Sequence, residues 1–163
     1  MGVTSNRPRC YVASPLGFSE AGRHYYRAVY LPALATVVTP VDPWALTTED
    51  EMAEAADPLR EREMLLSVGC RNIDAIRSCS VLAAYLDGQE LDSGTVAELG
   101  FAAGIGLVCF GLRTDLRQHG EFATAVNLQV ETLIVESGGR ISLTLAELVR
   151  DLAAMGRATS LRP

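Results

Sequence analysis

Residues 81–110 read VLAAYLDGQELDSGTVAELGFAAGIGLVCF, and this stretch decides the fold. It opens with a continuous apolar run at 81–86 and closes with a second one at 107–110. Such runs are typical of strands that are buried on both faces of a parallel sheet. Between them lie a loop rich in Gly, Asp and Ser and a helical segment at 95–103. The stretch therefore predicts a strand, a helix and a second parallel strand.

The same alternation continues on both sides of this unit. Further strands are expected at 10–14, 36–39 and 132–135, and further helices at 19–35, 58–78 and 143–155. Pro40 is expected to stop the second strand, and Pro32 is a position where the first helix can end early. The pattern predicts one domain over 1–163, a doubly wound α/β fold. Its sheet would be mostly parallel and five-stranded, with helices on both faces.

Composition narrows the class of protein. The chain has 163 residues, 48% of them apolar and 21% charged, as in an ordinary globular domain. Its formal net charge of −6 argues against nucleic acid or an anionic membrane as the main partner. The four cysteines form no C-x-x-C pair, and no signal-peptide core or membrane-length apolar run is found. We expect reduced thiols and a cytoplasmic protein.

In this architecture, ligands bind beyond the carboxyl ends of the strands. Four loop segments are expected there, namely 14–18, 42–44, 87–94 and 111–115. Their convergence predicts where a site lies but not which chemistry it performs.

Glu98 has two interpretations. With Thr95 as the first helix cap, Glu98 would complete a capping box by accepting from the Thr95 amide. Yet Glu98 is the only charged residue between Asp92 and Arg113, at a helix start that otherwise looks buried. Asp92, Gly94 and Glu98 can also face one pocket, where Gly94 would let a ligand approach the backbone closely.

The run DSGTVAELGFA at 92–102 resembles the signature of nucleoside 2-deoxyribosyltransferases. Three weaker blocks resemble that family in the same order: YVASPL at 11–16, NIDAI at 72–76 and VNL at 126–128. The resemblance implies a flavodoxin-like fold that exchanges the base of a 2′-deoxyribonucleoside for a free nucleobase, with retention. It calls for no metal and no nicotinamide cofactor.

The resemblance also implies roles for single residues. Glu98 falls on the nucleophile, which attacks C1′ and forms a deoxyribosyl ester, as in a retaining glycosidase. Tyr11 would orient Glu98 and keep it ionised. Asp92 would bind a sugar hydroxyl and Asn72 the edge of the base. Asn127 would complete the sugar site of a neighbouring subunit, which requires a homo-oligomer.

Several assignments stay open at this point. Asn72 cannot protonate the leaving base, and Asp42 either takes that role or caps the short helix before Trp44. Phe18 and Trp44 are either base-stacking aromatics or packing residues. Ser14, in the first loop, is a further candidate for substrate binding.

Two other functions compete with base exchange. A 2′-deoxynucleoside 5′-monophosphate N-glycosidase would use water as the acceptor, but such relatives carry a small hydroxyl residue where this chain has Asp92. A carboxylate there favours an unphosphorylated nucleoside, because it repels a close phosphate. A non-catalytic nucleotide-sensing module would tolerate the loss of Glu98. The joint presence of Glu98, Tyr11 and Asp92 favours an enzyme.

Overall fold

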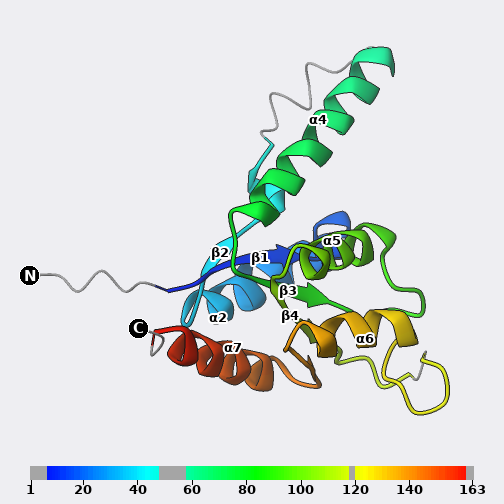
Figure 1. The fold of residues 1–163 in the computed structure, drawn as a ribbon. Coiled ribbons are helices and arrows are strands. Elements are labelled where there is room, and N and C mark those ends of the chain that lie inside the picture. Colours follow the sequence, from blue (N-terminus) through cyan, green and yellow to red (C-terminus); the bar gives the residue numbers. More distant parts are fainter. Residues whose placement is uncertain (1–6, 48–57, 118–119, 161–163) are drawn as a thin grey trace, which may run out of the picture.

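The computed structural model describes residues 7–47, 58–117 and 120–160. At its centre is a five-stranded sheet in the order β2-β1-β3-β4-β5, in which every neighbouring pair is parallel (Figure 1). The strands are β1 (Arg9–Ala13), β2 (Thr39–Val41), β3 (Val81–Tyr85), β4 (Val108–Leu112) and β5 (Ile141–Ser142). The predicted doubly wound parallel sheet is confirmed.

Helices cover both faces of the sheet. They are α1 (Glu20–Tyr25), a π-helical turn η2 (Tyr26–Tyr30), α2 (Leu31–Ala35), α4 (Pro58–Arg77), α5 (Ser93–Gly104), α6 (Leu128–Glu136) and α7 (Leu145–Ser160). Short 3-10 turns, η1 (Pro15–Phe18) and η3 (Pro43–Ala45), follow β1 and β2. Because successive side chains of a strand point to opposite faces, Tyr11 packs with α4, α5 and α6, whereas Val12 packs with α1, α2 and α7.

The strand predicted at 132–135 is wrong. These residues lie inside α6. Asn127 caps the start of this helix, because its Oδ1 accepts a hydrogen bond from the Gln129 amide at 3.0 Å. Val130 and Ile134 are buried on one side of this helix, and Val135 is 56% exposed. The β-branched run favours a strand locally, but the four-residue spacing of the buried positions suits a helix against the sheet. The last strand is instead β5, with two residues.

The second strand lies later than the predicted 36–39. It spans Thr39–Val41 and contains Pro40, which pairs with Cys10 of β1. Pro40 has no amide hydrogen to donate, and β2 is an edge strand, where this loss is tolerated. The proline therefore lies within the strand and does not stop it.

Pro32 does not end the first helix either. The chain passes from α1 through the π-helical turn, where the Leu31 amide donates to the Tyr26 carbonyl oxygen, five residues back. Pro32 then stands in the first turn of α2, where the missing amide hydrogen costs little. Tyr26 and Tyr30, from the widened turn, are both buried against the sheet.

Helix α4 matches its predicted position, and its two halves have different surroundings. Near its end, buried Ile76 joins the core. Its first turns rise away from the sheet (Figure 1). None of the helices in the described segments is long and apolar enough to cross a membrane.

Candidate active site

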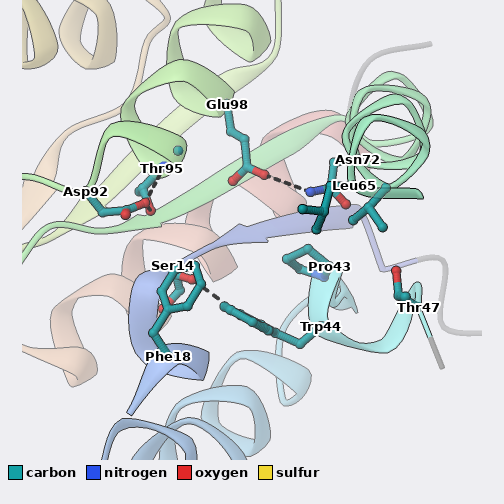
Figure 2. A pocket seen from close by; sticks show the side chains of 12 residues that line it. Ser14, Phe18, Pro43, Trp44, Thr47, Leu65, Asn72, Asp92, Thr95 and Glu98 are labelled. Carbon is teal, nitrogen blue, oxygen red and sulfur yellow. Dashed lines mark hydrogen bonds between the residues drawn. The ribbon is translucent and has the colours of Figure 1, made fainter. Parts of the chain in front are cut away.

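A cavity of about 450 Å³ lies where three neighbouring strands end (Figure 2). Ser14 follows β1, Trp44 follows β2, and Asp92 follows β3; all three side chains border the cavity. One side is closed by the middle of α4, through Leu65 and Val68. Parallel strands carry their carboxyl ends to the same edge of a sheet, which is why these loops meet.

Glu98 reaches the cavity from the first turns of α5. Its Oε1 accepts a hydrogen bond from the Tyr11 hydroxyl at 2.6 Å and one from Asn72 Nδ2 at 3.4 Å. Among the described residues, no donor is bonded to its Oε2. The pKa of Glu98 lies above the ordinary carboxyl value because burial disfavours the charge, while the Tyr11 hydrogen bond pulls it down. The nearby Asp92 carboxylate adds a smaller upward effect.

The capping box predicted from Thr95 and Glu98 is not formed. Asp92 is the cap of α5, and its Oδ2 accepts from the Thr95 amide at 2.7 Å and from the Thr95 hydroxyl at 2.9 Å. A carboxylate suits this place, because the first amides of a helix are unpaired and carry partial positive charge. Because Asp92 and not Glu98 caps the helix, the Glu98 side chain is free to turn into the cavity.

Tyr11 does not border the cavity but stands behind Glu98. It lies in β1, and its side chain is completely buried. Burial and the adjacent Glu98 carboxylate both raise the pKa of Tyr11 far above its ordinary value. The phenol therefore keeps its proton and acts as a donor to Glu98.

Asn72, from α4, points its side-chain amide toward Glu98 (Figure 2). Its amide nitrogen is engaged with Glu98, but its buried Oδ1 has no hydrogen-bond partner within the described part of the chain. A buried acceptor without a donor is costly. A bound molecule with an N–H or O–H group at this place would lower that cost.

The opposite end of the cavity is aromatic. The rings of Phe18 and Trp44 meet edge to face, with centroids 4.8 Å apart. Trp44 Nε1 donates to the Ser14 carbonyl oxygen at 3.3 Å, and the indole lies directly on Gly17 (Figure 2). The cavity thus has a carboxylate end and an apolar, ring-bearing end.

Most of the predicted site residues come together here, and three do not border the cavity. The bordering ones are Glu98, Asp92, Asn72, Gly94, Ser14, Phe18 and Trp44. Besides Tyr11, the exceptions are Asp42 and Asn127. Asp42 Oδ1 accepts from the Trp44 amide and from the Tyr26 hydroxyl, so its carboxylate caps η3 and does not face the cavity as an acid.

Asn127 lies outside the cavity, at the start of α6. Its Nδ2 donates to the Glu121 carboxylate at 3.0 Å, and its Oδ1 caps the helix. The loop at 111–115 also contributes nothing to the cavity walls. Instead, the amides of Thr114 and Asp115 donate to Asp87, which fastens the loop that leads to α5.

Five bordering residues were not named as site residues in the sequence analysis, although one of them lies in the expected segment 42–44. They are Pro43, Thr47, Leu65, Val68 and Thr95. Leu65 and Val68 were missed because the rule that sites lie at strand ends says nothing about a helix that rises past the sheet. Leu65, Val68 and Asn72 are three and then four residues apart, so they lie on one face of α4. This spacing was the one signal in the sequence that could have placed the two residues beside Asn72.

Comparisons with known proteins bear on the family and the fold. The family model described as nucleoside 2-deoxyribosyltransferase matches residues 10–142. A search of curated proteins finds no match.

Solved structures that share the fold include the following three. A conserved protein from Enterococcus faecalis V583 has a TM-score of 0.72 at 23% identity, covering 91% of this chain and 99% of its own. A 2-desoxiribosyltransferase from Leishmania mexicana has a TM-score of 0.61 at 24% identity, covering 88% and 97%. A CMP N-glycosidase from Clostridium botulinum has a TM-score of 0.51 at 17% identity, covering 90% and 98%. At these identities, the likeness concerns the fold and not the activity.

Proposed function

Because the chain belongs to the nucleoside 2-deoxyribosyltransferase family, we propose that it moves 2-deoxyribose from one nucleobase to another, with Glu98 as the nucleophile. The observation that carries this proposal is the Glu98 carboxylate at the cavity. One oxygen is held by Tyr11 and Asn72, and the other has no bonded donor in the described segments. A held carboxylate with one available oxygen suits attack on a carbon atom.

In the first step, Glu98 Oε2 attacks C1′ of the deoxyribose. The bond from C1′ to the base nitrogen breaks, its electron pair leaves with the base, and a deoxyribosyl ester forms. The transition state carries positive charge on the sugar, which the carboxylate stabilises at close range. Asn72 is a hydrogen-bond donor and not an acid, so the leaving base takes its proton from solvent.

In the second step, a nitrogen of the incoming base attacks C1′ from the opposite face and expels the Glu98 carboxylate, and the base releases its N–H proton to solvent. The two inversions give net retention. Tyr11 supports both steps, since its hydroxyl stabilises the ionised carboxylate that attacks first and departs later. Its effect opposes that of burial, which favours the protonated and unreactive form of Glu98.

The ends of the cavity suit the two parts of a nucleoside. The Asp92 side chain caps α5 and borders the same cavity as Glu98, so we place the sugar hydroxyls there. Phe18 and Trp44 offer ring edges and faces to a base at the other end. The unpartnered Oδ1 of Asn72 would accept a hydrogen bond from an N–H group of the base.

The test is base exchange with 2′-deoxyinosine and adenine, followed by chromatography, with the Glu98→Ala variant beside the wild type. New 2′-deoxyadenosine from the wild type alone would support both the transfer and the nucleophile. Release of hypoxanthine without a new nucleoside would assign a hydrolase, and 2′-deoxynucleoside 5′-monophosphates would be tried next. No reaction with either class of substrate would refute an enzymatic role. A deoxyribosyl adduct on Glu98, detected by mass spectrometry, would separate a catalyst from a sensing module.

We further propose that Asn127 acts in the site of a neighbouring copy, as the family resemblance implies. Asn127→Ala and Glu98→Ala chains would each be inactive as pure samples. If sites are shared between copies, mixing and reassembling the two variants would restore part of the activity, because one mixed site then holds both intact residues. Mixed samples that stay inactive would contradict a shared site.

A further inference from the structure

The Tyr26 hydroxyl makes a buried contact that the proposed chemistry does not use. Tyr26 is 2% exposed, and its hydroxyl donates to Asp42 Oδ1 at 2.8 Å. Tyr26 belongs to the helical layer, whereas Asp42 follows the edge strand β2. The hydrogen bond therefore ties the loop after β2 to the helices beneath it.

The same oxygen of Asp42 also holds the turn that carries Trp44. Asp42 Oδ1 accepts from the Trp44 amide at 3.0 Å and is the cap of η3. With two donors on one oxygen, the position of the carboxylate sets the position of the turn. A shift of Asp42 would carry the Trp44 backbone with it.

Trp44 has little freedom as long as its backbone stays in place. Its indole donates to Ser14, packs edge to face on Phe18, and lies against Gly17, where an added Cβ would come within 2.2 Å of Cε2. These contacts all come from one segment, the loop after β1. The contact with Asp42 differs from these, because it holds the backbone of Trp44 within its own turn, η3.

The π-helical turn provides an internal comparison. It contributes two tyrosines four residues apart, both in the core and with ring centroids 6.1 Å apart. The Tyr30 hydroxyl is buried and finds no partner in the part of the chain that is described, whereas the Tyr26 hydroxyl holds Asp42. Widened helical turns of this kind recur at functional sites. The contrast marks Tyr26 as the tyrosine whose hydroxyl has a specific contact.

We infer that Tyr26 is a positioning residue that acts through Asp42 to hold Trp44 as the wall of the base-binding end of the cavity. That this wall binds a base rests on the proposed function. That Tyr26 holds Trp44 in place through Asp42 is independent of the proposed function. Trp44 is the single tryptophan of the chain, so its intrinsic fluorescence reports on the wall alone.

The experiment compares Tyr26→Phe with Tyr30→Phe. The second variant also removes a tyrosine hydroxyl from the π-helical turn, but it breaks no hydrogen bond with the described part of the chain. Two quantities are measured: quenching of Trp44 fluorescence by acrylamide in the free protein, and KM and kcat for 2′-deoxyinosine. We expect Tyr26→Phe to increase the quenching constant and to raise KM about tenfold, which corresponds to about 1.4 kcal/mol. Its kcat should stay within about twofold, because the nucleophile is untouched. Tyr30→Phe should leave both quantities at wild-type values.

A double variant tests the route through Asp42. If Tyr26 acts through Asp42, Tyr26→Phe adds nothing to the quenching and the KM of Asp42→Ala. Independent, additive effects would overturn the inference. So would a Tyr26→Phe variant that unfolds at a lower temperature but keeps wild-type quenching, because the contact would then stabilise the fold without holding the wall. If the wild type has no transferase activity, the proposed function fails, and the quenching measurements still decide whether Tyr26 holds Trp44.

Discussion

Replacing Tyr11 with phenylalanine removes one hydroxyl from the centre of the proposed mechanism. The hydroxyl donates to Glu98 at 2.6 Å from a completely buried position, so its loss leaves the packing almost unchanged. Glu98 then keeps only the longer contact from Asn72, at 3.4 Å. The variant therefore tests the hydrogen bond and not the shape of the core.

The size of the effect follows from the charge on the acceptor. A hydrogen bond to a charged group contributes about 1.5–3 kcal/mol, and about 1.4 kcal/mol corresponds to a factor of ten. Because the Asn72 contact remains and can tighten, we expect the lower end, a loss of about tenfold in kcat/KM at neutral pH. The effect depends on pH. The Tyr11 contact lowers the pKa of Glu98, so its removal raises that pKa further. Glu98 attacks only when ionised, and the loss should thus be largest at low pH and smaller at high pH.

The assay measures kcat/KM for exchange between 2′-deoxyinosine and adenine from pH 5 to pH 9, for the wild type, Tyr11→Phe and Glu98→Gln. The acid limb of the Tyr11→Phe profile should lie at higher pH than that of the wild type, and Glu98→Gln should be inactive at every pH. Thermal unfolding of each variant controls for folding. Wild-type activity in Tyr11→Phe would refute the role of the hydroxyl. A constant loss across the pH range would refute its effect on the ionisation of Glu98.

Three further predictions concern the stability of the chain and the binding of its substrate. Burial raises the pKa of Glu98 in the folded chain. Between the pKa of the unfolded chain and that of the folded chain, the folded chain holds a proton that the unfolded chain has released. The free energy of unfolding therefore falls as pH rises between these two pKa values. Glu98→Gln should therefore unfold about 1–3 °C higher than the wild type at pH 7.5, and calorimetry at pH 4 should find the difference gone. Asp92→Ala should cost about 1 kcal/mol of stability, because the helix cap is lost. Asp92→Asn should keep the cap and raise only KM. Equal unfolding temperatures for the two variants would contradict the capping role of Asp92. Gly17→Ala places a Cβ within 2.2 Å of the Trp44 ring, so KM should rise severalfold with kcat little changed, and an unchanged KM would show that the ring position is unimportant.

Much of the fold was predictable because its signals are local. The apolar runs at 81–86 and 107–110 correspond to β3 and β4, and the helical pattern between them corresponds to α5. Both failures with strands have tertiary causes. Residues 132–135 have side chains that favour strands, yet burial against the sheet on a four-residue spacing makes them part of α6. Pro40 stands within β2 because that strand is at the edge of the sheet, which local sequence does not reveal.

The candidate site divides in a similar way. Glu98 stood out in the sequence as an isolated charge inside a motif, and it borders the cavity as predicted. The predicted cap of the helix was Thr95, but aspartate also caps helices well, and Asp92 lies three residues earlier. The structure decides for Asp92, whose carboxylate reaches the Thr95 amide.

By itself, then, the sequence determined the α/β class and the order of the central elements, and it singled out Glu98 as an isolated charge at a helix start. These properties depend on hydrophobic period and residue type, which are written in consecutive positions. The family resemblance had implied the contact of Tyr11 with Glu98, and the structure contains it. Only the tertiary structure decided that Tyr26 contacts Asp42 and which face of α4 borders the cavity. The residues joined by these two hydrogen bonds lie 16 and 87 positions apart along the chain. Local sequence does not reveal such contacts, because the packing of whole helices and strands sets the distance between the two residues and local preference does not.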